Sequence, residues 1–231
     1  MTTNKNPENI KKMFNELASD YDFMNQIISF GLHKLLKRVC LRLPDLPENA
    51  IIADLCCGTG DIARILAKNK KVKKIFALYF SENMLKIAKN KTNSDKIDFV
   101  QGDCTNLPFA TSSLDGCTMA FGLRNIQNYE KSVSEIQRVL KNGGFFLHLD
   151  IFKGAEPENT IFDLAACNFA KIFSKSPESY KYLISSKNNF LPPQKLAESV
   201  ENQGFKCKKI KNYAFGMISM QLFVKDCSPM G

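Results

Sequence analysis

The stretch 51–61 limits most strongly what this chain can fold into. An apolar run from Ile51 to Leu55 gives way to Gly58-Thr59-Gly60 and then to a helical apolar pattern. This order predicts a buried strand, a tight loop and the first turn of an amphipathic helix. Glycine lets the loop backbone take positive φ and approach a ligand, and the N–H groups at the helix start face the same crevice. The stretch therefore predicts a loop that binds a nucleotide-like ligand.

Strand patterns alternate with helix patterns along most of the chain. After a basic turn at 70–74, we expect strands at 75–79, 97–100, 114–121 and 145–151, and helices at 61–69, 82–91, 130–140 and 194–203. Ser81 is the expected N-cap of the second of these helices, and Asn142-Gly143-Gly144 the expected stop of the third. The segments 205–210 and 215–224 would close the sheet as a hairpin. The alternation predicts an α/β fold with a mostly parallel sheet, helices on both faces and a C-terminal antiparallel hairpin.

Two helical segments depart from this alternation. Apolar residues at three-to-four spacing predict a helical N-terminal extension over 1–45, broken near Phe30-Gly31. The segment 153–190 reads as a helical insertion over the substrate pocket, within a single domain that spans 1–231. Its apolar stripe fits either core packing or a lid beside the ligand. The stripe consists of Phe162, Leu164, Phe169, Ile172 and Phe173.

Composition narrows the class of protein. The 32 Lys and Arg residues exceed the 23 Asp and Glu residues, which gives a net charge of +9. This charge fits a solvated lysine-rich surface, or attraction to anionic lipid, nucleic acid or acidic metabolites. The eight cysteines lack zinc-ligand spacing, and no apolar run is long enough to span a bilayer. We therefore expect a cytoplasmic protein without a metal, with peripheral contact at the inner membrane face left open.

The loop and a later strand end suggest the ligand. Gly58-Thr59-Gly60 lacks the third glycine of the dehydrogenase fingerprint, and Asp54 stands just before it. An acid at this place resembles the class I S-adenosylmethionine (SAM) methyltransferases, because it suits a ligand that carries an ammonium group. Asp103 follows another strand at the same carboxyl edge, where it would accept from an adenine amino group or simply cap a loop.

Motif blocks in order over nearly the whole chain resemble the demethylmenaquinone and polyprenyl-benzoquinol C-methyltransferases. The blocks are Tyr21-Asp22-Phe23-Met24-Asn25, Ser29-Phe30-Gly31-Leu32-His33-Lys34, Asp54-Leu55-Cys56-Cys57-Gly58-Thr59-Gly60-Asp61, Phe80-Ser81-Glu82-Asn83-Met84-Leu85, Leu107-Pro108-Phe109, Phe121-Gly122-Leu123-Arg124-Asn125, Arg138-Val139-Leu140-Lys141, Ser179-Tyr180-Lys181-Tyr182-Leu183 and Phe190-Leu191-Pro192-Pro193-Gln194. The first block and the one that contains Arg124 are more specific than the glycine loop. The resemblance implies a Rossmann-like class I methyltransferase fold.

The resemblance also implies SAM as the cofactor. The implied cofactor-binding residues are Asp54, Gly58, Thr59, Gly60, Tyr79, Asp103, Cys104 and Ala120. Thr59 and its glycines would hold the methionine part, and Asp103 with Cys104 the adenine. Tyr79 stands where the family usually carries an acid for the ribose hydroxyls, and a phenol cannot accept bidentately as a carboxylate does. Glu82 could compensate from the following helix.

Five residues form the catalytic set that the resemblance implies: Arg124, Tyr21, Asn125, Asp22 and His33. Arg124 would stabilise the phenolate that develops on a quinol, and Asn125 would orient the ring hydroxyl. Tyr21 would relay the proton, with Asp22 or His33 as alternatives. Two family positions differ here, because Asp150 replaces a Glu and Gln221 replaces a C-terminal His.

The expected function is SAM-dependent C-methylation of a polyprenyl quinol, with demethylmenaquinol as the substrate. Alternatives are the benzoquinol step of the ubiquinone pathway, both steps, another apolar small molecule, or an accessory protein that has lost catalysis. We expect a membrane-dissolved quinol as partner and no nucleic acid, since no basic stretch is interleaved with exposed aromatics. A homodimer stays open. The basic and apolar N-terminal helices, including Lys37, would either dock on a bilayer or cover the sheet.

Overall fold

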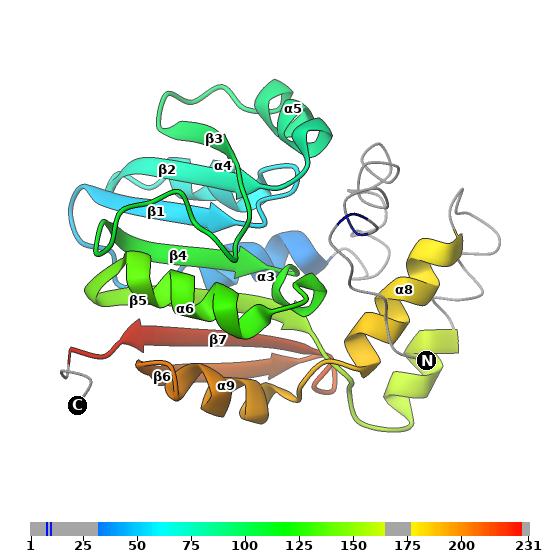
Figure 1. Cartoon of the computed structure of the whole chain (residues 1–231). Helices are drawn as coiled ribbons and strands as arrows, with labels where there is room; N and C mark the ends of the chain where they lie inside the picture. The colour runs from blue at the N-terminus through cyan, green and yellow to red at the C-terminus, as the bar shows by residue number, and fades with distance from the viewer. Residues whose placement is uncertain (1–7, 9, 11–31, 165–176, 228–231) are drawn as a thin grey trace.

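A seven-stranded sheet in the order β3-β2-β1-β4-β5-β7-β6 forms the centre of the computed structural model (Figure 1). The structure describes residues 8, 10, 32–164 and 177–227. The strands are β1 Ala50–Leu55, β2 Val72–Tyr79, β3 Ile97–Gln101, β4 Leu114–Ala120, β5 Leu140–Ile151, β6 Phe205–Tyr213 and β7 Ile218–Lys225. The helices are α3 Leu32–Cys40, α4 Asp61–Ala67, α5 Glu82–Asn90, η1 Leu123–Asn125, α6 Tyr129–Val139, α8 Pro177–Asn188 and α9 Pro193–Glu201.

The first five strands are parallel, and the last two are antiparallel, as the sequence predicts. β7 pairs with β5 and β6 with β7, so the C-terminal hairpin extends the sheet beyond β5. Helices α6 and α9 lie on one face of the sheet, in front in Figure 1, while α3 and α4 cover the other face. Each face has its own apolar core, because side chains alternate between the two faces along each strand.

The strand, loop and helix predicted from 51–61 form as expected, and Ser81 caps α5. The Ser81 hydroxyl accepts a hydrogen bond from the Met84 backbone N–H at 3.3 Å. β2 begins earlier than predicted, at Val72 rather than at Ile75. Val72 is buried against the core while Lys73 is exposed, so the basic segment expected as a turn alternates as a strand does.

The segment Asn142-Gly143-Gly144 does not stop a helix, which corrects the prediction from the sequence. α6 ends at Val139 and β5 begins at once, because Leu140 pairs with Leu114 of β4. The strand register then shifts before Gly116, and Gly143 takes a φ of 74° within this irregular start. The glycines therefore serve a bulged strand entry.

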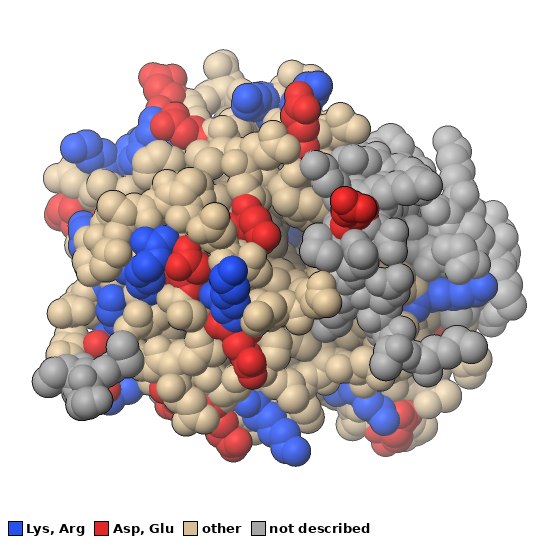
Figure 2. Space-filling view, viewed as in Figure 1, with Lys and Arg blue, Asp and Glu red and all other residues tan. Residues whose placement is uncertain are grey.

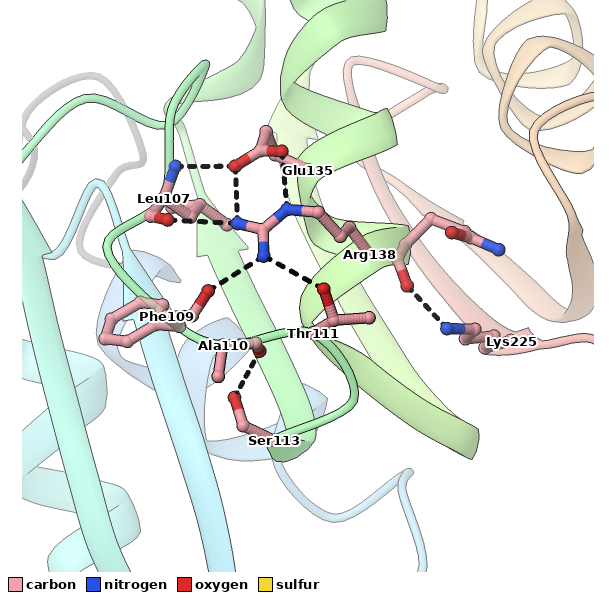
Figure 3. Close-up of polar contacts among 9 residues, drawn as sticks. Leu107, Phe109, Ala110, Thr111, Ser113, Glu135, Arg138 and Lys225 are labelled. Carbon is pink, nitrogen blue, oxygen red and sulfur yellow. Dashed lines mark hydrogen bonds and ion pairs between the residues drawn. The ribbon is translucent and has the colours of Figure 1, made fainter.

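The loop after β3 is fastened to α6 by Arg138 (Figure 3). Arg138 binds both carboxylate oxygens of Glu135 and donates to the carbonyl oxygens of Phe109 at 2.9 Å and Leu107 at 3.0 Å. Glu135 in turn accepts from the Leu107 backbone N–H at 2.8 Å. The Arg138 guanidinium holds the pKa of Glu135 below its usual value. Two of the quoted motif blocks thus meet in one clamp.

Within the segment 153–190, the structure describes helix at 158–164 and in α8, whereas 153–157 is irregular. The buried Lys187 of α8 forms an ion pair with Asp163 at 2.9 Å, which joins the two helices. Its ammonium also lies over the ring of Phe162 at 5.5 Å, whereas Leu164 is 61% exposed. The remaining stripe residues, Phe169, Ile172 and Phe173, lie outside the described residues. Within the described part of the chain, no helix is long and apolar enough to cross a bilayer.

Candidate functional site

The glycine loop has the backbone geometry that its sequence predicts. Gly58 and Gly60 take φ values of 55° and 79°, in the left-handed region that favours glycine. Gly60 is the N-cap of α4, and Thr59 is buried between the two glycines. The loop runs along one wall of a pocket at the carboxyl edge of the sheet. This pocket is lined by Lys37, Asp54, Cys56, Cys57, Thr59, Ile62, Ala120 and Phe121.

Asp54 is buried beneath this loop with an unusual pKa. Its carboxylate accepts hydrogen bonds from the Ala63 N–H at 3.1 Å and the Thr118 hydroxyl at 2.9 Å. Burial nevertheless raises the pKa of Asp54 to about 7, against the opposing effects of Thr118 and of the Lys37 charge. Among the described residues no cation forms an ion pair with Asp54. A cationic group of a ligand would therefore favour the ionised form of this carboxyl.

Lys37 is a site residue that the sequence did not reveal. It comes from α3 in the N-terminal extension, and its side chain is only 9% exposed. Its ammonium lies 3.0 Å from the Asp61 carboxylate and 6.0 Å from the centre of the Phe121 ring. Lys37 is thus directed at the pocket, and Leu36 beside it belongs to the core, which fits the alternative that this part of the N-terminal extension covers the sheet. No local pattern marks this lysine, since the contact depends on how α3 packs against α4.

The predicted adenine and ribose residues lie at the same edge of the sheet. Asp103 is exposed, and its carboxylate accepts from the Thr105 N–H at 2.8 Å, so it does cap its own loop. Cys104 is buried with its sulfur 3.6 Å from that of Cys56, and its contribution to a ligand is therefore limited to its backbone. Tyr79 ends β2 and is 4% exposed, with its ring 4.8 Å from that of Phe80.

Gly122 lies where the glycine loop meets the segment that carries Arg124. A Cβ atom at Gly122 would lie 2.6 Å from the Cβ of Cys56, closer than such atoms approach one another. Only glycine therefore lets the turn after β4 pack against the turn after β1. The motif block of the glycine loop and the block that contains Arg124 are thus in contact, and Ala120 and Phe121 line the pocket beside them.

Arg124 and Asp150 form a buried ion pair beside this pocket. Arg124 Nη1 donates to Asp150 Oδ1 at 2.5 Å and to the Phe121 carbonyl oxygen at 2.7 Å, and the Arg124 backbone N–H donates to Asp150 Oδ2. Burial alone would raise the pKa of Asp150, but the charges of Arg124 and His148 outweigh it and keep the pKa below its usual value. Within the described residues, the buried Nε of Arg124 has no hydrogen-bond partner. The guanidinium therefore retains unused donor capacity.

Asn125 is positioned by a tyrosine that the quoted motifs contained but did not mark. The Tyr182 hydroxyl donates to Asn125 Oδ1 at 3.1 Å, and the Asn125 amide donates to the Phe121 carbonyl oxygen at 3.3 Å. Burial raises the pKa of Tyr182 to about 12. The charge of Asp150 adds to this increase in the pKa, and the charge of Arg124 opposes it. Tyr182 therefore stays protonated at neutral pH and serves as a hydrogen-bond donor.

Three predicted catalytic residues cannot be placed. Tyr21 and Asp22 lie outside the described residues. His33 belongs to α3, but its side chain is also outside the description. The proton relay assigned to these residues therefore stays a prediction.

The surface charges do not gather into a single-sign patch on the face that Figure 2 presents. There, Lys and Arg side chains lie interspersed with Asp and Glu side chains. Several of the lysines are paired with acids, including Lys74 with Asp98 at 2.7 Å. The mixture of both signs on this face fits a solvated surface better than a nucleic-acid interface.

Comparisons with known proteins connect the chain to methyltransferases. A family model described as the ubiE/COQ5 methyltransferase family matches residues 1–225. A demethylmenaquinone methyltransferase of Staphylococcus carnosus (strain TM300) is 35% identical over 226 residues, which cover 95% of this chain and 94% of that protein.

Solved structures share the fold at lower identity. One similar structure comes from a Haloferax volcanii complex between the Trm112 methyltransferase activator and a methyltransferase. Its matching chain has a TM-score of 0.72 at 19% identity, and the match covers 92% of this chain and 97% of that chain. A SAM-dependent methyltransferase of Thermotoga maritima has a TM-score of 0.66 at 17% identity, with coverages of 93% and 99%. The expected class I methyltransferase fold is thereby confirmed.

Proposed function

Because the chain belongs to the ubiE/COQ5 methyltransferase family, we propose that it C-methylates the ring of a polyprenyl quinol, converting demethylmenaquinol to menaquinol. The observation that carries this proposal is the buried Arg124–Asp150 pair beside the glycine-loop pocket. Relatives that carry the name demethylmenaquinone methyltransferase favour this substrate over the benzoquinol of the ubiquinone pathway.

The pocket has the charges that SAM requires. SAM supplies a methyl group on a sulfonium, which is already electrophilic, so the protein's task is to hold and align it. We assign the ammonium of its methionine part to Asp54 and the carboxylate to Lys37, which offers opposite charges to the two ends of an amino acid. Gly58, Thr59 and Gly60 would approach the same part through their backbones.

The residues for the adenine and ribose are assigned from the family resemblance and from their place at the carboxyl edge of the sheet. Asp103 and the Cys104 backbone N–H would bind the adenine, and Tyr79 would face the ribose with Ala120 nearby. The exposed Asp103 carboxylate retains an oxygen beyond the one bonded to Thr105. Tyr79 offers one hydroxyl where a carboxylate would offer two acceptors, so ribose affinity should be lower than a carboxylate would give.

At the acceptor, the protein must make a ring carbon nucleophilic. A quinol ring carbon gains electron density when a neighbouring hydroxyl loses its proton, and Arg124 would stabilise the resulting phenolate. Asn125, held by Tyr182, would orient the ring hydroxyl. The hydroxyl proton would leave through Tyr21, with Asp22 and His33 as alternatives. As the bond from the methyl group to the ring carbon forms, its bond to the SAM sulfur would break, and the ring carbon would then lose its own hydrogen as a proton, which restores the aromatic ring. Alignment of the methyl group with the ring carbon is worth roughly 7–11 kcal/mol in well-oriented reactions.

The isoprenoid tail of the substrate requires access from a bilayer. Three large apolar side chains are exposed: Ile161 at 62% and Leu164 at 61% in one helical segment, and Phe215 at 68% in the β6–β7 turn. The Phe215 carbonyl accepts from the Ala155 N–H at 3.0 Å, which brings the β6–β7 turn beside the segment that carries the other two. We assign peripheral membrane contact to this surface. Co-sedimentation with vesicles should fall when Phe215 is changed to Ser, and an unchanged bound fraction would reject the surface.

The decisive experiment for the function is incubation with candidate acceptors. Purified protein and SAM are mixed with demethylmenaquinol, with a demethylated benzoquinol, and with sterol and fatty acyl lipids as controls, and products are read by mass spectrometry. One added methyl on demethylmenaquinol is the expected result. Methylation of the benzoquinol alone would move the protein to the ubiquinone pathway, and methylation of a control lipid alone would reject a quinol substrate.

A binding measurement separates an enzyme from an accessory protein that has lost catalysis. Calorimetric titration with S-adenosylhomocysteine, the demethylated product of SAM, should give saturable binding at one site. Absence of binding would remove SAM from the proposal, whatever the acceptor.

A further inference from the structure

His148 lies directly behind the Arg124–Asp150 pair. It is fully buried on β5, one pleat before Asp150 and on the same face of the sheet. Its partner across the sheet is Gln221 of β7, which stands where the family resemblance expects a His. In this chain the histidine of the pair lies on β5, and the glutamine lies on β7. Its ring nitrogens face Gln221 on one side and Asp150 on the other.

The orientation of the Gln221 amide fixes one ring proton. Gln221 Nε2 donates to the carbonyl oxygen of Pro193 at 2.6 Å. A proline carbonyl can only accept, so the amide nitrogen must face it and the amide oxygen must face His148. Gln221 Oε1 lies 3.1 Å from His148 Nδ1. Since that oxygen also only accepts, Nδ1 must carry a hydrogen.

The second ring nitrogen faces a carboxylate. His148 Nε2 lies 3.6 Å from Asp150 Oδ2, and among the described residues it has no hydrogen-bond partner. In a neutral ring with hydrogen on Nδ1, the Nε2 lone pair would point at a negative charge 3.6 Å away. A hydrogen on Nε2 turns this repulsion into a buried ion pair. Both ring nitrogens therefore face acceptors.

From this geometry we propose that His148 is a positioning residue held as an imidazolium, which shares the charge of Asp150 so that Arg124 can serve the acceptor anion. The ring faces Asp150 on β5 and the neutral Gln221 of β7, while Arg124 in η1 and Tyr182 of α8 interact with the same Asp150. Two cations against one carboxylate leave the cluster with a net positive charge. This positioning role deepens the proposed function and rests on it. The protonation state of His148 is independent of the proposed function.

The protonation state is measured on the unmodified full-length protein by NMR of ¹⁵N-labelled histidine. An imidazolium gives nearly equal shifts for its two ring nitrogens, and a neutral ring gives widely separated ones. The chain has two histidines, so the signal that disappears in His148→Gln assigns the ring. Nearly equal shifts for His148 at neutral pH are expected. Widely separated shifts would overturn the proposal, irrespective of any activity.

Two substitutions at Gln221 test what holds the proton. Gln221→Met removes the acceptor at Nδ1 with little change in volume, and the His148 shifts should then separate. Gln221→Glu keeps an acceptor of the same length, and the shifts should stay nearly equal. If Gln221→Met leaves the ring unchanged while circular dichroism shows it folded, Gln221 does not set the charge of His148.

Kinetics test the consequence for the quinol. In His148→Gln, Asp150 would neutralise Arg124 alone, and kcat should fall about tenfold or more while S-adenosylhomocysteine affinity stays unchanged. A kcat equal to that of the unmodified enzyme would reject the positioning role. Failure of demethylmenaquinol as a substrate would instead reject the proposed function, because the NMR result is obtained without any acceptor.

Discussion

Asp54 and Asp150 are both buried carboxyls near the carboxyl ends of strands, yet their electrostatic environments are opposite. Asp54 on β1 has no ion-pair partner among the described residues, and burial raises its pKa to about 7. Asp150 on β5 contacts Arg124 and faces His148, and its pKa is lowered despite equal burial. Desolvation acts on both, so nearby cations decide the difference.

This difference indicates which charge on a ligand each end of the site would stabilise. The Asp54 end lacks a cation in contact, and an ammonium of the cofactor would complete it. The Asp150 end already has an excess of donors on Arg124, and it suits an anion that forms on the acceptor. The carboxyl edge of the sheet would thus offer a negative charge to a cationic methyl donor and a positive charge to an anionic nucleophile. The two charges meet at Phe121, which lines the pocket and accepts a hydrogen bond from Arg124.

The largest effect should follow from removing the cation at the acceptor end. Arg124→Met should lower kcat by about 10²–10³-fold, as loss of a preorganised charge-stabilising donor does in other enzymes. Steady-state kinetics with demethylmenaquinol would measure this loss, and calorimetry should give unchanged S-adenosylhomocysteine affinity. Arg38→Met removes an exposed arginine of equal charge away from the pocket and serves as the control. Near-normal turnover in Arg124→Met would remove the distinction between the two ends.

A smaller effect is expected from the lysine at the cofactor end. Lys37→Met should weaken S-adenosylhomocysteine binding about tenfold, the magnitude of one charged hydrogen bond. Arg38→Met, on the exposed face of the same helix, removes the same charge without reaching the pocket. Equal affinities of the two variants in calorimetry would show that Lys37 makes no specific contact with the ligand.

The pH dependence of cofactor binding tests Asp54 directly. Because the folded pKa of about 7 exceeds the usual value of about 3.9, the protonated carboxyl stabilises the free protein at low pH, and this contribution is lost as the pH rises toward 7. An ammonium ligand binds the ionised form, so affinity should rise as the pH rises toward about 7, by at most tenfold per pH unit, and level off above about pH 7.

Calorimetry in buffers of different ionisation enthalpy would detect the accompanying proton release from Asp54. Asp54→Asn should bind more weakly and without this pH dependence. A pH-dependent affinity that persists in Asp54→Asn would mean that another group titrates.

The smallest effect should come from the tyrosine that orients Asn125. Tyr182→Phe removes the hydrogen bond to Asn125 Oδ1 and should lower kcat about threefold to tenfold, as expected for one neutral hydrogen bond. Its pKa of about 12 predicts that the unmodified enzyme shows no kinetic step from this phenol near neutral pH. A loss as large as that of Arg124→Met would instead give Tyr182 a direct part in proton transfer.

Much of the fold could be predicted because local patterns and topology agree. The glycine loop follows a buried strand, Ser81 caps its helix, and the alternation fixes a parallel sheet whose carboxyl edge gathers Asp54, Asp103 and Arg124. Errors occurred where pairing with a neighbouring strand overrode a local signal, as at Asn142-Gly143-Gly144. The sequence shows these glycines, but only the pairing with β4 shows that they belong to the start of β5.

The site was less predictable because its contacts join distant segments. Lys37 reaches Asp61 from another helix, and Tyr182 reaches Asn125 across a long sequence separation. Gly122 is required by its distance to Cys56, which no spacing rule expresses. The motif blocks named most of these residues, whereas their roles depend on packing.

The Arg138 clamp has a consequence for how the cofactor pocket meets its ligand. Arg138 occupies carbonyl acceptors of the 107–111 loop, which follows directly on Asp103 and Cys104. A loop whose backbone is already bonded to a helix has little conformational freedom left to lose. If Asp103 and Cys104 bind the adenine as proposed, this wall of the pocket is preorganised, and cofactor binding requires little further ordering of this loop.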